Sequence, residues 1–470
     1  MYTFTYPAEK YDELNLNKRE ILHLIQKHAT IAVKLKKNMD YYEGIQEILN
    51  RKKEDGAPNN KLVCNHAKDI SDTASSYFIG EPITYKSAND ISILTDALET
   101  AGADETDGDN GLDLSVYGIA YDYIYAKKNE TELTIKNLPP THTFMVYDDT
   151  IEQNELFAVY YYAKKDDTDQ SKTKYVATVL TQNYRYVLNI LNCDEEQELI
   201  EEPESHYMGE VPITEYLNNK LGIGDFELQI PLIDAYNAIM SDRVNDKEQF
   251  IDSILAIYGT LLSDEDYEID EEGNGDGKGT AEAMKRLKNE KLLEMPGEGA
   301  KAEYLTHTFD ESGVEILRKA IEQDIHKFSH IPCMTDESFG GNVSGVAMEF
   351  KLLGMENITK IKTRYYKKGI RKRIQIFSRW LSLNGKSVDI TGIKPIFTRC
   401  MPKNLLEISQ WVSNLWGKVS KKTLLSQIPF VDDVEAELAA LEEEEEKSAQ
   451  RQQEIFGNQN TPIEDDEDVE

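Results

Sequence analysis

One stretch of the 470-residue sequence carries residue types that could bind a phosphate group. The segment GNGDGKGT at 273–280 is rich in glycine, like a phosphate-binding loop. However, Gly279 follows Lys278 where that motif needs Ser or Thr, and Glu272 occupies the place of its first glycine. Because two of its defining positions fail, we interpret this segment as a flexible turn.

Two other patterns resemble metal sites, and each lacks a ligand. The acidic segment at 270–282 has Gly275 in the turn position of a calcium loop, but Ala281 replaces the bidentate glutamate that such a loop needs. His326 and His330 lie one helical turn apart, a spacing that can bind zinc, yet no third ligand is evident. We therefore expect no metal and no cofactor, and we expect both histidines to be solvated near the end of a helix.

Residues that could catalyse a reaction are equally hard to find. No serine–histidine–aspartate or cysteine–histidine set has a recognisable local signature. Paired carboxylates carry little information in a chain with 86 acidic residues. The sequence therefore predicts a protein that is not an enzyme. The cysteines show no CxxC spacing, and we expect free thiols in a reducing cytoplasm at Cys64, Cys193, Cys333 and Cys400.

The strongest positive cluster lies between residues 360 and 373. One interpretation is contact with DNA phosphates, and the other is ion pairing with acidic subunits or domains. The formal net charge of −34 and the pI of about 4.7 favour ion pairing, because so much negative charge must be balanced somewhere. They also argue against nucleic-acid binding through a broad basic surface. The cluster comprises Lys360, Lys362, Arg364, Lys367, Lys368, Arg371, Lys372 and Arg373.

Two helices and the loop between them must position this cluster. Val314, Leu317 and Ile321 recur at three- and four-residue spacing and predict a helix that Pro332 terminates. The second helix covers 346–383 without a proline, so it would span roughly 55 Å, which is too long for an ordinary helix of a small domain.

The amino-acid sequence of this stretch resembles that of a known protein family. DESFGGNVSGVAMEFKLLGME is similar to the tunnel loop and following helix of portal proteins from tailed double-stranded-DNA bacteriophages, in particular long-tailed phages of Gram-positive hosts. Further similar segments, in the family's order, extend the resemblance over roughly residues 60–440. The resemblance implies an α+β portal fold in a ring oligomer, typically of twelve subunits. The tunnel loop that it implies consists of Thr335, Asp336, Glu337, Ser338, Phe339, Gly340, Gly341, Asn342 and Val343.

Periodicity and the resemblance together predict the order of the parts. Segments between 132 and 199 alternate as in an antiparallel meander, and long amphipathic stretches predict the helices. The expected parts are an N-terminal helical segment (1–60), an α/β wing of helices and antiparallel strands (61–228), a first stem helix (229–262), a small α/β clip (263–308), a second stem helix (309–333), the tunnel loop (334–345), a long helix of the wing (346–383), a wing strand (384–402), a helical crown (403–441) and an acidic disordered tail (442–470).

The resemblance also implies a function. The chain would be the portal vertex protein, whose channel lets viral double-stranded DNA be packaged into the procapsid, retained and ejected. Expected partners are the DNA, terminase, the major capsid and scaffolding proteins, and a head-completion adaptor. The protein would occur at the portal vertex of the virion and, during assembly, in the host cytoplasm. The alternative is a capsid scaffold or adaptor without a channel. With no signal segment and no apolar run of about 18 residues, we expect no membrane association.

Overall fold

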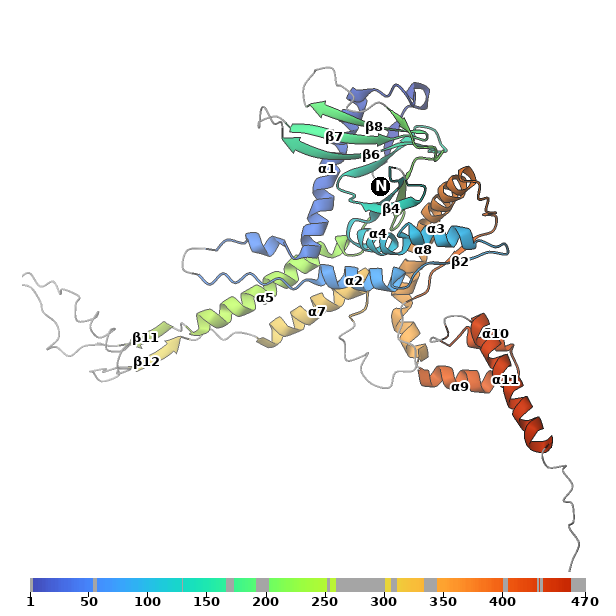
Figure 1. Ribbon diagram of the computed structural model, residues 1–470. Helices are drawn as coiled ribbons and strands as arrows, with labels where there is room; N and C mark the ends of the chain where they lie inside the picture. The colour runs from blue at the N-terminus through green and yellow to red at the C-terminus, as the bar shows by residue number, and fades with distance from the viewer. Residues whose placement is uncertain are drawn as a thin grey trace, which may run out of the picture. The chain divides into compact units, whose positions relative to one another are not determined.

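The computed structural model describes residues 3–53, 57–128, 130–165, 173–191, 203–251, 254–258, 301–305, 311–333, 345–399, 405–428, 431 and 434–457. The chain divides into two compact units, which are described separately. The larger unit comprises Met1–Cys333 and Gly354–Arg399, and the smaller comprises Met334–Leu353 and Cys400–Glu470. Helices and strands are mixed along the chain, which confirms the predicted α+β class (Figure 1).

The first sheet of the larger unit has the strand order β1-β5-β6-β7-β8-β9. Its strands β5 to β8 form the antiparallel meander that alternation predicts. Helix α1 packs Ile21 and Ile25 against Phe144 and Phe157 of this sheet. The strands are β1 (Phe4–Tyr6), β5 (Thr143–Asp148), β6 (Glu155–Lys165), β7 (Thr173–Leu180), β8 (Tyr184–Leu191) and β9 (Glu204–Ser205), and α1 is Lys18–Glu43.

The second sheet has the order β10-β3-β4 and takes one strand that the sequence assigned to the meander. Tyr121 pairs with Leu138, so β4 forms a hairpin with β3 instead of joining β5. Pro139 and Pro140 follow β4 directly, and because proline has no backbone N–H they end the ladder before the chain enters the next sheet. The strands are β3 (Ile119–Ala126), β4 (Leu133–Leu138) and β10 (Ile213–Leu217).

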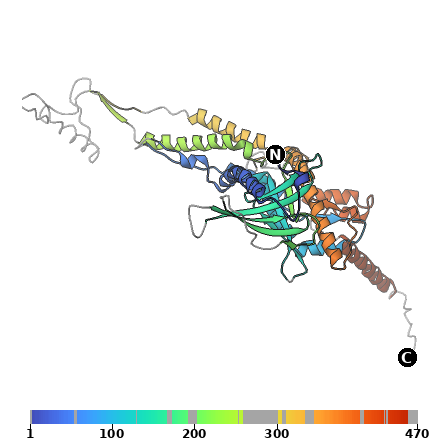
Figure 2. The ribbon, with the colours of Figure 1, turned by 90° about the horizontal axis from the view of Figure 1, so that it is seen from above.

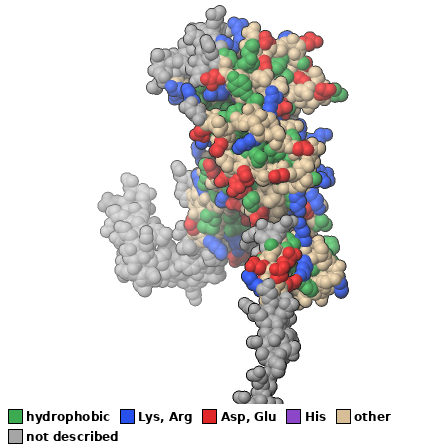
Figure 3. Space-filling model, turned by 45° about the vertical axis from the view of Figure 1, so that its right-hand side comes forward, with side chains coloured by type: hydrophobic (Ala, Val, Ile, Leu, Met, Phe, Trp, Pro, Cys, Tyr) green, Lys and Arg blue, Asp and Glu red, His purple; other side chains and the backbone are tan. Residues whose placement is uncertain are grey.

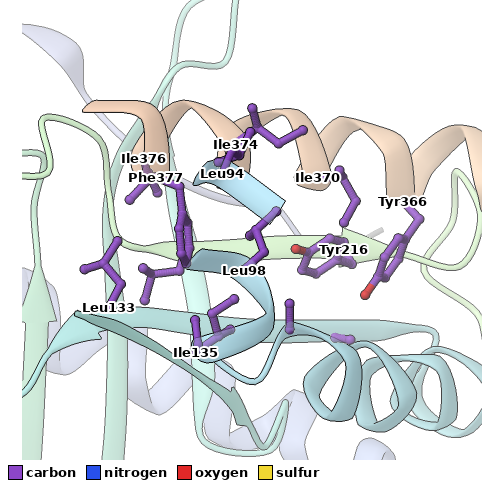
Figure 4. Close-up of a cluster of buried hydrophobic side chains, with 14 of the residues drawn as sticks. Leu94, Leu98, Leu133, Ile135, Tyr216, Tyr366, Ile370, Ile374, Ile376 and Phe377 are labelled. Carbon is purple, nitrogen blue, oxygen red and sulfur yellow. The ribbon is translucent and has the colours of Figure 1, made fainter. Parts of the chain in front are cut away.

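Helices from distant parts of the chain cover this second sheet. Leu94 and Leu98 of α3, Ile135 of β4 and Phe377 of α8 meet in one buried apolar cluster (Figure 4). Strand β13 pairs antiparallel with β2 and so joins the segment after α8 to the segment between α2 and α3. The elements are α2 (His66–Ile79), β2 (Thr84–Lys86), α3 (Ser92–Thr100), α4 (Ala103–Tyr117), α8 (Gly345–Leu383) and β13 (Lys394–Ile396), with short 3-10 turns at Ala8–Lys10, Glu47–Asn50 and Glu227–Gln229.

The two expected stem helices lie side by side and antiparallel (Figures 1 and 2). Arg243, in the second half of α5, binds Glu311 and Glu315 in the first half of α7 at 3.1 and 2.8 Å. Tyr236, in the first half of α5, accepts a hydrogen bond of 2.8 Å from Arg318, which comes after both glutamates in α7. These helices are α5 (Ile230–Ile251) and α7 (Glu311–Ser329).

The first stem helix is shorter than the range 229–262 that the sequence predicts. Helix α5 ends at Ile251, and the chain then forms β11 (Ile254–Tyr258), which pairs antiparallel with β12 (Lys301–Leu305). The sequence ILAIY of β11 is rich in β-branched and aromatic side chains, which favour a paired strand over a helix. Its apolar residues also fit the helical spacing of α5, so the predicted helix extends too far.

The described part of the smaller unit is helical, and its last helix enters the segment predicted to be disordered. Residues 442–457 form the second part of α11, because this acidic segment also contains good helix formers and an ion pair of 2.6 Å between Lys447 and Glu443. Residues 458–470 lie outside the described part of the chain. The described helices of this unit's C-terminal segment are α9 (Leu405–Leu415), α10 (Lys421–Leu425) and α11 (Val434–Gly457).

Candidate functional site

The basic cluster of the sequence lies on α8, and part of it points into the protein. Lys362 forms a 2.8 Å ion pair with Asp225, and the two side chains are only 3% and 7% exposed. Lys372 binds the carboxylate of Glu155 and donates a hydrogen bond of 2.7 Å to the carbonyl of Ile213. These lysines therefore join α8 to the strands and loops beside it.

Arg373 is the most deeply buried member of the cluster. Its Nη2 lies 2.8 Å from Asp107 and 2.5 Å from Asp122, and its side chain is fully buried. Tyr366 donates a hydrogen bond of 2.5 Å to Asp107, and Tyr216 donates one of 2.8 Å to Asp122. Burial alone would lower the pKa of Arg373, but the neighbouring carboxylates and tyrosines keep it well above its usual value. The guanidinium therefore stays charged and joins α8, α4 and β3.

The remaining cations lie at or near the surface. Lys360 forms a 3.6 Å ion pair with Glu356, one helical turn away. The ammonium group of the half-buried Lys367 lies 5.6 Å from the ring centre of Phe397. The helix thus divides the predicted cluster into an inner, paired set and an outer set. The exposed members are Lys360, Arg364, Lys368 and Arg371, at the three- and four-residue spacing of one helical face.

The predicted tunnel loop, Thr335 to Val343, lies outside the described residues, as does the glycine-rich segment 270–282. The helices on either side of the loop are described: α7 ends at Ser329 and α8 begins at Gly345. The sequence had placed these helix boundaries within a few residues.

The prediction of two solvated histidines is wrong for His326. Its side chain is 8% exposed, its Nδ1 lies 3.1 Å from the carbonyl oxygen of Ile331, and its ring centre is 5.6 Å from that of His66. Burial, reinforced by His326, lowers the pKa of His66. His330 is exposed and follows the end of α7 with a positive φ of 60°. Within the described ranges, no three His, Cys, Asp or Glu side chains are grouped so that they could hold a metal ion.

Two further sequence expectations concern the thiols and the membrane. Cys64 and Cys333 form no disulfide bond, and burial raises the pKa of the Cys64 thiol; Cys193 and Cys400 lie outside the described residues. Of the helices that the structure describes, none is long and apolar enough to cross a membrane.

Comparison with known proteins decides the family. The family model described as "Phage portal protein, SPP1 Gp6-like" matches residues 21–451. The chain belongs to this phage portal family. Its similarity to the portal protein of Bacillus phage SPP1 is 25% identity over 435 residues, covering 89% of this chain and 82% of that protein. The portal protein of Clostridium phage phiCD119 is 24% identical over 408 residues, covering 82% of this chain and 85% of the relative.

These portal relatives come from phages of Gram-positive hosts, so the resemblance seen in the sequence is confirmed. Among solved structures, the neck of the native GTA (gene transfer agent) particle computed with C12 symmetry matches with a TM-score of 0.45 at 10% identity, covering 77% of this chain and 89% of that one. The neck of the empty GTA particle computed with C6 symmetry matches with a TM-score of 0.41 at 11% identity, covering 79% and 89%.

Proposed function

We propose that this portal family member is the subunit of a ring, of the twelve-subunit kind typical of the family, whose central channel carries viral double-stranded DNA into the procapsid. The ring would retain the packaged DNA and release it at ejection. The observation that carries the ring is the apolar surface that the second stem helix leaves exposed.

Helix α7 is amphipathic, and the described part of the chain leaves several of its large apolar side chains exposed. Ile316 is 71% exposed, Leu317 is 50% exposed and Phe328 is 56% exposed, whereas Ile325 is fully buried. Burying an apolar side chain of this size is worth roughly 1.5–3 kcal/mol. A neighbouring subunit supplies the missing cover if the stems stand side by side around an axis.

The proposed partners follow from the family. The channel passes the DNA, terminase docks during packaging, and a head-completion adaptor docks afterwards. The major capsid and scaffolding proteins surround the ring at one vertex of the virion, after assembly in the host cytoplasm. The net charge of −34 fits a channel past which DNA slides, because like charges oppose adhesion of phosphate.

Size exclusion with light scattering and electron microscopy of the purified protein tests this proposal. We expect particles many times the 53.7 kDa mass of one chain, with a central hole. A protein that stays monomeric at micromolar concentration would contradict the portal ring. Closed assemblies without a hole would favour the capsid scaffold or adaptor.

We also propose that the chain has no ATPase or nuclease activity of its own and that ATP hydrolysis belongs to terminase. The support is the failure of the phosphate-loop pattern at Glu272 and Gly279. Turnover of ATP or DNA by highly purified protein, abolished by a single substitution in this chain, would overturn that part.

A further inference from the structure

The outer surface of α8 carries an unusual concentration of positive charge for so acidic a protein. We call the exposed residues Lys360, Arg364, Lys368 and Arg371 the basic face. Ile361, which is 44% exposed, lies beside these cations. A surface that combines cations with an exposed aliphatic side chain suits another protein surface better than a phosphate backbone.

A concentration of negative charge lies where the end of α1 meets α4. The carboxylates of Asp113, Glu43 and Asp40, together with burial, raise the pKa of Tyr117, so all three lie near its phenol group. Figure 3 shows acidic and basic side chains interspersed over the face that it draws. Glu105, Asp109 and Asp113 follow one another at four-residue spacing along α4, and together with Asp40 and Glu43 at the end of α1 we call them the acidic patch.

The pKa of Asp113 reflects its burial and a neighbouring carboxylate. Burial raises the pKa of Asp113 to about 7, and Asp109 adds to the effect. The hydrogen bond of 2.8 Å from the Asn137 amide opposes that rise. A cation brought to the patch from outside would therefore stabilise the carboxylate form of Asp113.

The basic face and the acidic patch point away from each other. Arg373 of α8 binds Asp107 of α4 at 2.8 Å, so these two side chains mark the facing sides of the two helices. Arg371 is two residues before Arg373, and Glu105 and Asp109 are each two residues from Asp107. Two residues correspond to roughly 160–200° around a helix, so Arg371, Glu105 and Asp109 lie on the opposite side of their helices from the Arg373–Asp107 contact.

We propose that the basic face of one copy docks on the acidic patch of the next copy, so that these two surfaces form one head-to-tail interface of the ring. This inference rests on the proposed ring and names the surfaces that hold it together. Two complementary surfaces on opposite sides of one subunit are what a head-to-tail interface requires, and such an interface closes into a ring when its rotation allows.

The first test reverses the basic face. The triple variant Arg364→Glu, Lys368→Glu, Arg371→Glu places like charges opposite the patch, and we expect the concentration for half-assembly to rise by more than about a hundredfold. The control variant Lys10→Glu, Lys128→Glu, Lys220→Glu makes the same change in net charge at exposed, dispersed positions and should assemble like the wild type. Sedimentation velocity and electron microscopy give the ring fraction.

The second test asks whether the acidic patch is the partner. The variant Glu43→Lys, Glu105→Lys, Asp109→Lys should also fail to assemble alone. Mixed in equal amounts with the basic-face variant, it should form rings again, because each interface then joins opposite charges. Mutual rescue is hard to explain by misfolding of either variant, and circular dichroism checks that each remains folded.

The outcomes separate this inference from the proposed function. If the wild type forms rings and the basic-face variant does so equally well, the inference is wrong while the portal ring stands. If that variant forms normal rings but loses retention of double-stranded DNA, the basic face contacts DNA and the inference is again wrong. Failure of the mixture to assemble excludes the acidic patch as the partner. A wild type that never forms rings would overturn both proposals.

Discussion

A single fully buried guanidinium, that of Arg373, joins three elements that lie far apart in the sequence. It lies within 2.8 Å of carboxylates on α4 and β3, and Asp122 is 251 residues away along the chain. Replacing a buried ion pair as a whole can be nearly neutral. Removing only one partner leaves the other charge buried and unpaired, which costs roughly 3–5 kcal/mol. The contribution of Arg373 is thus mainly to keep Asp107 and Asp122 paired.

We therefore expect Arg373→Met to lower the free energy of unfolding by roughly 3–5 kcal/mol. Met matches much of the aliphatic volume but leaves both carboxylates without a counter-charge. The exposed Arg19→Met is the matched control and should change stability by less than about 0.5 kcal/mol. Urea titration followed by circular dichroism measures both. A loss below about 1 kcal/mol for Arg373→Met would show that Asp107 and Asp122 are not left as unpaired buried charges.

His28 gives a prediction about pH. Its side chain is 2% exposed, and its Nδ1 lies 2.8 Å from the Tyr161 hydroxyl. Burial, with a smaller effect of His142, lowers the pKa of His28 to about 4. Because the unfolded chain takes up this proton near pH 6.5, stability is lost as the pH falls from about 6.5 to 4. We expect His28 to account for roughly 2–3 kcal/mol of that loss.

The variant His28→Gln isolates this contribution, because glutamine keeps a polar group near Tyr161 and does not titrate. The stability difference between the wild type and His28→Gln should shift against the wild type as the pH falls, and should be constant above about pH 7.5. Chemical unfolding at a series of pH values measures it. A pH-independent difference would show that His28 has the same pKa in the folded and the unfolded chain.

At the scale of elements, α8 crosses β10 at a glycine. A Cβ atom added to Gly369 would lie 2.3 Å from the ring of Tyr216, which is fully buried and hydrogen-bonded to Asp122. Alanine normally stabilises a helix by about 1 kcal/mol relative to glycine. Here we expect the reverse, because overpacking of a filled core costs roughly 1–3 kcal/mol.

Gly354 on the same helix is the matched control, since its added Cβ would meet His330 at an ordinary distance of 3.5 Å. Gly354→Ala should leave the melting temperature unchanged or raise it, whereas Gly369→Ala should lower it. Differential scanning fluorimetry distinguishes the two. Equal shifts in the same direction would mean that α8 moves away from β10 freely.

Long elements were easier to predict than the contacts between them. An uninterrupted helical pattern located α8 almost to the residue, and Pro332 marked the end of α7. The sequence also contains a sign that Arg373 points inward, because it falls on the same helical stripe as the buried Tyr366, Ile370 and Phe377. Its partner Asp122 could not be predicted, because a contact between residues 251 positions apart produces no local sequence pattern.

The prediction of short strands failed for a related reason. Strand β1 has three residues, too few for any period to show, and is held by its parallel pairing with β5. Strand β11 kept an apolar pattern that continued the stripe of α5, so its pairing with β12 decided the conformation. Where pairing outweighs local preference, the sequence alone predicts the wrong element.

At the scale of the whole molecule, net charge and assembly oppose each other. Subunits with a formal net charge of −34 repel one another unless complementary surfaces meet. Lys362, Lys372 and Arg373 of α8 form ion pairs within the larger unit, whereas the exposed cations of the basic face can also reach a neighbour. A channel lined by such subunits would keep DNA from adhering. Any segment of the protein that contacts the moving DNA would then have to be mobile.

The last prediction concerns the proposed tunnel loop. Gly340 and Gly341 allow backbone conformations that a side chain restricts. If each loop must adjust as the DNA surface passes it, then Gly340→Val with Gly341→Val should leave ring assembly intact and reduce the DNA packaged per capsid. The alanine pair should show a smaller effect, since valine is also stiff at its branched Cβ. Electron microscopy counts rings, and the packaged DNA is measured after nuclease treatment of the capsids. Normal packaging by the valine pair in normal rings would remove this loop from the translocation mechanism, while the channel itself would stand.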